Sequence, residues 1–275
     1  MARDIEEMTE DENHRGAQGD CRITVIFDAF ERLNEFRVDD WFVREFCRAS
    51  GSTLKIILGR ESLKWDQYDP IWQIHIDHYP ALSNLKPNDA LEYLNRRNVG
   101  DSDLKNYLIE LTDGFPYHLR LAADLCQSIL ETKGREPGKD DFATAGKNAN
   151  LGDALLSLIL RQLSADEQDA TLLLSIPRWF TVDILEMLVA EPASTLRLFQ
   201  TLTRYSFCEK IPDKVNTYSI RKEARKFLRE RARQLKHWLL WNKKMKDFHG
   251  QARNEITNLA EMIYHSFIIE PYDAV

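Results

Sequence analysis

The sequence predicts a small parallel α/β part followed by a larger all-α part, and three observations lead to this fold class. Two short apolar runs without polar alternation, residues 23–27 and 54–58, are typical of strands buried on both faces of a parallel sheet. From residue 84 onward, apolar residues recur mostly with helical spacing. Two β-rich segments, 207–211 and 217–220, then follow a series of predicted helices and indicate a hairpin.

Composition limits the classes of function. A chain of 275 residues is long enough for two domains, and its net charge of −7 gives no general case for nucleic-acid binding. No apolar run approaches the roughly 20 residues that cross a bilayer, and the acidic start is not a signal peptide. We expect a cytoplasmic protein that binds no membrane. The scattered cysteines fit a reducing compartment and argue against a zinc site or a disulfide framework: Cys21, Cys47, Cys126 and Cys208.

The first predicted domain follows an acidic lead-in, residues 1–20, which we expect to be disordered. Asp28 stands at the carboxyl end of the first strand, where α/β sheets bind ligands, and Glu31 comes three residues later. A helix is expected over 36–50, with two acids near its start, and Arg60 follows the end of the second strand.

A third strand is predicted over 72–76. His75 and His78 would point to opposite sides of such a strand, so a metal site there is not favoured.

The next segment has the pattern of a small helical domain, residues 84–132. Its first helix should be capped by Asn88 or Asp89, and a second helix should cover 102–112. Gly114 then ends that helix and Pro116 opens the next, within a Leu-x-x-Gly-x-Pro-x-x-Leu run. The Gly- and Pro-containing residues 133–150 are expected to form a linker.

The last part begins with a predicted helix over 151–163. A capping box at Ser164 opens the next predicted helix, and two more are expected over 181–189 and 194–204. Helices followed by a hairpin are the order of a winged helix, so 151–222 is predicted to be one. The 26 residues of 221–246 hold eleven Lys or Arg against two Glu. They indicate helices with solvated basic faces and an aromatic packing side, or a surface for nucleic acid or an acidic partner.

Taken in order, these motifs resemble those of the STAND branch of P-loop ATPases, the relatives of NACHT and NB-ARC proteins, over residues 22–270. The resemblance makes the first strand the Walker B strand, with Asp28 helping to hold Mg²⁺ and Glu31 polarising the attacking water. Arg60 matches a sensor of the γ-phosphate. Gly114 and Pro116 match a motif whose proline packs against adenine in a helical lid. Arg221 stands where many members have a His that contacts the β-phosphate of ADP.

The resemblance also implies what is missing. The family begins with a strand, a GxxxxGK[ST] loop and a helix, and the 275 residues contain no such loop. The loop supplies most contacts to the triphosphate. We therefore expect the back part of a STAND signalling switch, truncated before Walker B: partial nucleotide domain 21–83, lid 84–132, winged helix 151–222, and a basic segment with the start of helical repeats, 223–275.

ATP or ADP and Mg²⁺ are the cofactors that the resemblance implies, and this chain alone is expected to bind neither. Protein partners or self-association through the switch are the expected interactions. The alternative is a winged-helix interaction module that binds nucleic acid or a partner protein through 221–246. An independent hydrolase is less favoured, because no nucleophile–base constellation is identifiable.

Overall fold

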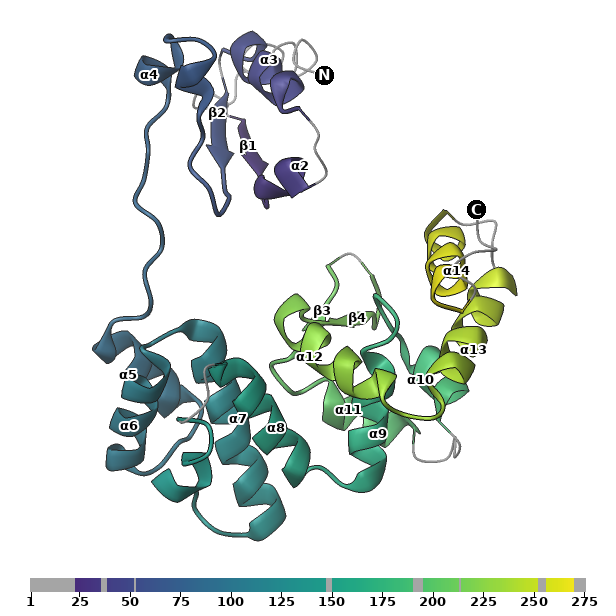
Figure 1. Ribbon diagram of the computed structural model, residues 1–275. Coiled ribbons are helices and arrows are strands. Elements are labelled where there is room, and N and C mark those ends of the chain that lie inside the picture. The colour runs from purple at the N-terminus through teal and green to yellow at the C-terminus, as the bar shows by residue number, and fades with distance from the viewer. Residues whose placement is uncertain are drawn as a thin grey trace, which may run out of the picture. The chain divides into compact units, whose positions relative to one another are not determined.

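The computed structural model describes residues 23–35, 39–51, 53–146, 150–189, 195–212, 214–251 and 256–269 (Figure 1). The chain divides into two compact units, Met1–Ser83 and Asn84–Val275. The coarse fold class is confirmed, because the described residues are mostly helical and include a small parallel sheet.

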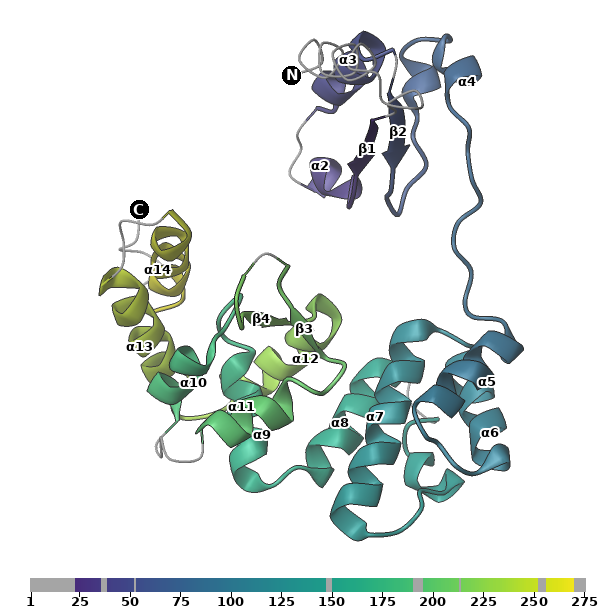
Figure 2. The same ribbon diagram turned by 180° about the vertical axis from the view of Figure 1, so that it is seen from behind.

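The first unit is built on two parallel strands, β1 (Thr24–Phe27) and β2 (Leu54–Ile57), in the register Thr24↔Leu54. The short α2 (Glu31–Glu35) follows β1, and α3 (Trp41–Ala49) connects onward to β2 (Figure 2). Val43 of α3 lies in a small core with Trp65 and Trp72. Both strands and the acidic start of α3 were predicted, although residues 36–38 lie outside the described part.

Two predictions for this unit are wrong. The strands are not buried on both faces, since Ile26 and Leu54 are each 59% exposed. The expected third strand is a helix, α4 (Trp72–His75), preceded by the 3₁₀ turn η1 (Trp65–Gln67). The cause of this helix is local: the Asp69 side chain accepts a hydrogen bond from the Ile71 amide, which turns the chain just before the helix, and Pro70 fixes a φ close to the helical value.

The second unit opens with four helices, α5 (Pro87–Arg96), α6 (Ser102–Thr112), α7 (Pro116–Lys133) and α8 (Leu151–Gln162). The predicted cap of α5 by Asn88 or Asp89 is wrong, because the helix already begins at Pro87, a position that suits proline. Residues 133–150, expected as a linker, include η2 (Lys139–Phe142), whose Phe142 is fully buried. That segment therefore contributes to the core.

Beyond α8 come α9 (Ala165–Leu174), α10 (Val182–Leu188) and α11 (Thr195–Leu202). The capping box predicted at Ser164 and Glu167 is present at the start of α9. The predicted hairpin is confirmed as antiparallel β3 (Cys208–Lys210) and β4 (Tyr218–Ile220), and Phe180 adds an antiparallel bridge to Tyr218. The basic segment forms α12 (Lys222–Arg233) and most of α13 (Trp238–Gln251), and α14 (Ile256–Ile269) packs along α13.

One continuous apolar core runs through the second unit from Ala90 of α5 to Met245 of α13. Within the described ranges, no helix has both the length and the apolar character needed to span a bilayer. Cys47, Cys126 and Cys208 are free thiols, and Cys21 lies outside the described residues.

Candidate functional site

The carboxyl ends of β1 and β2 bring together two of the predicted site residues. The Nε atom of Arg60 lies 3.5 Å from Oε1 of Glu31, so acid and guanidinium form an ion pair. Leu58 at the end of β2 donates its amide to Phe27 and accepts that of Phe30, which holds the two strand ends together. The Arg60 side chain is 68% exposed, whereas that of Glu31 is only 17% exposed.

Asp28 is exposed at the same strand end, and its Oδ1 accepts a hydrogen bond of 2.8 Å from the amide of Ala29. Ala29 has a φ of +54°, an unusual conformation for alanine that turns the chain toward α2. Within the described part of the chain, Oε2 of Glu31 is buried without a hydrogen-bond partner. A carboxylate oxygen left in this way is an acceptor ready for a water or another donor.

These residues suit the part of a nucleotide site that holds Mg²⁺ and a phosphate, but the part that cradles the triphosphate is missing. Asp28 is a suitable ligand for Mg²⁺, which often takes one or two carboxylates and keeps its waters, and Arg60 is suited to a phosphate. No three His, Cys, Asp or Glu side chains are grouped to hold a metal ion in the described ranges. The amide cradle for a triphosphate has no counterpart in the sequence.

Gly114 and Pro116 occupy the turn between α6 and α7, in the second unit. Gly114 has a φ of +63°, and a Cβ atom there would lie 2.3 Å from the carbonyl oxygen of Leu85. The Gly114 carbonyl in turn accepts the Leu85 amide at 3.0 Å. Pro116 is the first residue of α7 and is exposed. The glycine therefore serves a close crossing of two backbones.

Arg221 fastens the start of α12 to the chain before and within β3. Its Nε donates to the carbonyl oxygen of Ser206 at 2.9 Å, and its Nη1 lies 3.1 Å from Oε2 of Glu209. The guanidinium thus has protein partners on two of its three nitrogens. A phosphate at this place would have to compete with them.

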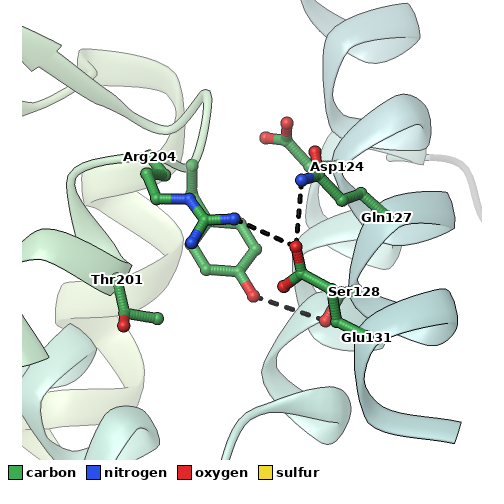
Figure 3. Close-up of a pocket in the computed structure, with 7 residues that line it drawn as sticks. Asp124, Gln127, Ser128, Glu131, Thr201 and Arg204 are labelled. Atoms are coloured by element: carbon green, nitrogen blue, oxygen red, sulfur yellow. Dashed lines mark hydrogen bonds and ion pairs between the residues drawn. The ribbon is translucent and has the colours of Figure 1, made fainter. Parts of the chain in front are cut away.

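A set of polar contacts that the motifs did not indicate joins α7 to the turn after α11 (Figure 3). Asp124 is the centre of it, with a side chain only 2% exposed. Its Oδ2 accepts the amide of Ser206 at 2.6 Å, and its Oδ1 pairs with Nη2 of Arg97 at 2.6 Å. Burial raises the pKa of Asp124 in spite of these donors.

Two more contacts continue this line along α7. The hydroxyl of Tyr205 donates to Oγ of Ser128 at 3.3 Å, and Nη2 of Arg204 lies 3.0 Å from Oε1 of Glu131. Asp124, Ser128 and Glu131 are spaced by four and three residues, so they share one face of the helix. We call these residues of α7, with 204–206, the polar seam. A buried Asp within an apolar helix was the one sequence signal for it.

A buried polar cluster holds α13 and α14 together. Nδ1 of His265 lies 2.9 Å from Oδ1 of Asn242, and Nδ1 of His249 lies 2.8 Å from Oδ1 of Asn258. Glu261 is paired with Arg178, which comes from the chain between α9 and α10. The residues from Glu261 to His265, which lie in the segment expected to start the helical repeats, thus make their contacts within this unit.

The basic residues of 221–246 are largely used inside the second unit. Arg225 donates to the carbonyl oxygens of Ser175 and Ile176 at 3.0 and 2.9 Å, and burial lowers its pKa. Arg231 lies over the Phe227 ring and donates to Ser157. Other cations of the segment lie over aromatic rings or reach a backbone carbonyl: Arg229, Arg233 and Lys244.

The chain matches no protein-family model, and it has no match among the curated proteins.

Proposed function

We propose that the chain carries part of a STAND-type ATPase signalling switch: one edge of the nucleotide domain, a helical lid and a winged helix. The observation that carries the proposal is the Glu31–Arg60 pair at the carboxyl ends of two adjacent parallel strands. Ligands of α/β sheets bind at that edge, and an acid and an arginine there suit a metal-bound phosphate.

The second unit supports the same proposal by the order of its elements. α9, the bridging residue Phe180, α10, α11 and the β3–β4 hairpin follow one another, which is the order of a winged helix with a three-stranded sheet. The helices α5, α6 and α7, which cover the residues expected as the lid, precede it, as the lid does in the resembled family. In that family, exchange of ADP for ATP changes how lid and winged helix sit.

Nucleotide titration tests the catalytic side of the proposal. The 275-residue chain contains no phosphate-binding loop, so we expect calorimetric titration with Mg-ATP or Mg-ADP to give no binding tighter than about 1 mM. Micromolar binding that persists in the Arg60→Ala variant would contradict the role given to that arginine. Micromolar binding that Arg60→Ala abolishes would show a competent site and overturn the expected incompetence.

The coding DNA upstream of Met1 tests the family assignment separately. An in-frame GxxxxGK[ST] motif after a predicted strand supports the proposal. In the longer product that such a frame encodes, Glu31→Gln should slow ATP hydrolysis at least tenfold, because no carboxylate would orient the attacking water. Unchanged hydrolysis by that variant would remove Glu31 from the mechanism.

Nucleic-acid binding through 221–246 is not favoured, since most of its arginines already have partners within the unit. Fluorescence anisotropy with a labelled DNA duplex at physiological salt should show no binding tighter than about 100 μM, the weak end of non-specific affinity. Tight binding that falls steeply with added salt, and that falls further in the exposed-cation variant Lys236→Ala, would revive this alternative.

A further inference from the structure

The α13–α14 hairpin, at one end of the second unit, has polar groups inside and an apolar face outside (Figure 1). Asn and His side chains make the buried hydrogen bonds between the two helices. The outer face of α14 carries four apolar residues, which are between 38% and 83% exposed: Ile256, Leu259, Ile263 and Phe267. Their spacing of three, four and four residues places them on one side of the helix, and we call them the outer stripe.

The outer faces of the two helices differ in polarity. α13 presents Lys243, Asp247 and Gln251 at a spacing of four residues, and all three are exposed, as is usual for a helix face in water. The only Asp, Glu, Lys or Arg of α14 is Glu261, which is buried and paired with Arg178. The outer stripe therefore has no exposed charge on its own helix, which is typical of a surface that another protein surface covers.

The outer stripe is complementary to a second copy of itself. When two copies of α14 pack antiparallel about a twofold axis near Glu261, Ile256 of one copy lies opposite Phe267 of the other. The same axis brings Leu259 opposite Ile263 of the second copy, so each contact occurs twice. The chain carries a net charge of −7, so two copies repel one another in general, whereas this face brings no charges together. These properties favour a second copy as the occupant.

We propose that two copies of this chain associate through the outer stripe, with their α14 helices antiparallel. A helix of 14 residues is about 21 Å long, so this contact lies at the small end of the range for specific interfaces. We therefore expect a reversible dimer with a Kd of about 10 μM. The proposal goes beyond the proposed function and does not depend on it, because the contact requires neither a nucleotide nor the Glu31–Arg60 pair.

Sedimentation velocity of the full chain, at concentrations of about 1–200 μM, tests the proposal. We expect an equilibrium between monomer and dimer. Ile263→Glu brings a carboxylate from each copy into the apolar contact and should raise the Kd at least tenfold. A chain that stays monomeric over the whole range would overturn the proposal and leave the stripe to a different protein. A dimer that Ile263→Glu leaves unchanged would overturn it too, since the contact would lie elsewhere.

Leu240→Glu is the matched control. Leu240 is an exposed apolar residue of the same hairpin, but it precedes Lys243 and Asp247 by three and seven residues and so shares the charged outer face of α13. The control should keep the Kd within about twofold of that of the parent chain. Both substituted positions are exposed, and circular dichroism checks that both variants keep the helical fold. An equal rise of the Kd in both variants would mean that added charge, and not the stripe, decides association.

A mixture of two variants tests the antiparallel pairing itself. Leu259→Lys and Ile263→Glu should each weaken association of the variant chain with itself. In a dimer of one chain of each kind, the new lysine faces the new glutamate, and the second Leu259–Ile263 contact is unchanged. We expect the mixture to form this dimer at least fivefold more tightly than either variant forms its own. Failure of the mixture to recover association would overturn the twofold arrangement.

Discussion

Replacing Gly114 by alanine is expected to lower the free energy of unfolding of the second unit by about 3–5 kcal/mol, an exceptional effect for a single methyl group. The φ of +63° alone costs an L residue about 1–2 kcal/mol. The added Cβ would also lie 2.3 Å from the Leu85 carbonyl oxygen, which is backbone and cannot rotate away. Either the α6–α7 turn or the residues before α5 must move.

Gly134→Ala is the control for this prediction. Gly134 ends α7 with a φ of +62°, nearly that of Gly114, but no heavy atom lies within 4 Å of the position that a Cβ atom would take there. The substitution should cost only about 1 kcal/mol. Thermal unfolding followed by the helical circular dichroism should show losses of about 10 °C for Gly114→Ala and about 3 °C for Gly134→Ala. Equal losses would mean that the Leu85 contact contributes nothing.

Local signals made most of the fold predictable. The capping box at Ser164, the glycine stop at Gly114 and the proline start at Pro116 fix helix ends through residues only a few positions apart. The two strands at 23–27 and 54–58 were also predictable, because each run is too short for an amphipathic helix and is rich in β-branched residues. Residues 72–76 were expected to form a strand because of their β-rich composition, although Asp69 and Pro70 just before them favour a helix.

The contacts of the candidate site were less predictable, since they join residues far apart in sequence. Glu31 and Arg60 meet because parallel strands end at the same sheet edge, and the family resemblance had led us to expect both of them there. Nothing in the run around Ser206 shows that its amide will be held by Asp124. The sequence shows only that an acid lies among the apolar residues of a helix, where its burial is costly. The partners that offset this cost are seen only in the structure.

Acid is expected to destabilise the second unit through His265. Burial, with His249 and the cations Arg229, Arg225 and Arg178, lowers the pKa of His265 to about 3. Unfolding returns this pKa to about 6.5, so the unfolded chain binds the proton more tightly. Stability is therefore complete above pH 6.5 and falls as the pH drops toward 3, by about 2 kcal/mol at pH 5.

The geometry explains why the histidine stays neutral in the fold. Its ring is fully buried, and its Nδ1 is placed to donate to Oδ1 of Asn242, which leaves Nε2 as an acceptor. Glu261 faces Nε2 at 3.8 Å and would favour a proton there, but Arg178 already pairs with that carboxylate. The ring of His249 lies parallel to that of His265 at 6.3 Å, and a positive charge on one ring would repel a positive charge on the other.

Chemical denaturation at pH 7 and pH 5 measures this effect, and His265→Asn isolates it. An Asn side chain can keep a donor toward Asn242 and does not titrate, so this variant loses the component of about 2 kcal/mol in the pH dependence, although it is less stable at pH 7. The variant of an exposed histidine, His237→Asn, should keep the full dependence. Asp124, whose pKa is raised, contributes with the opposite sign in every variant and cancels in the comparison. Identical pH slopes for the parent chain and His265→Asn would show that His265 takes up no extra proton on unfolding, and the acid sensitivity would then have to lie elsewhere.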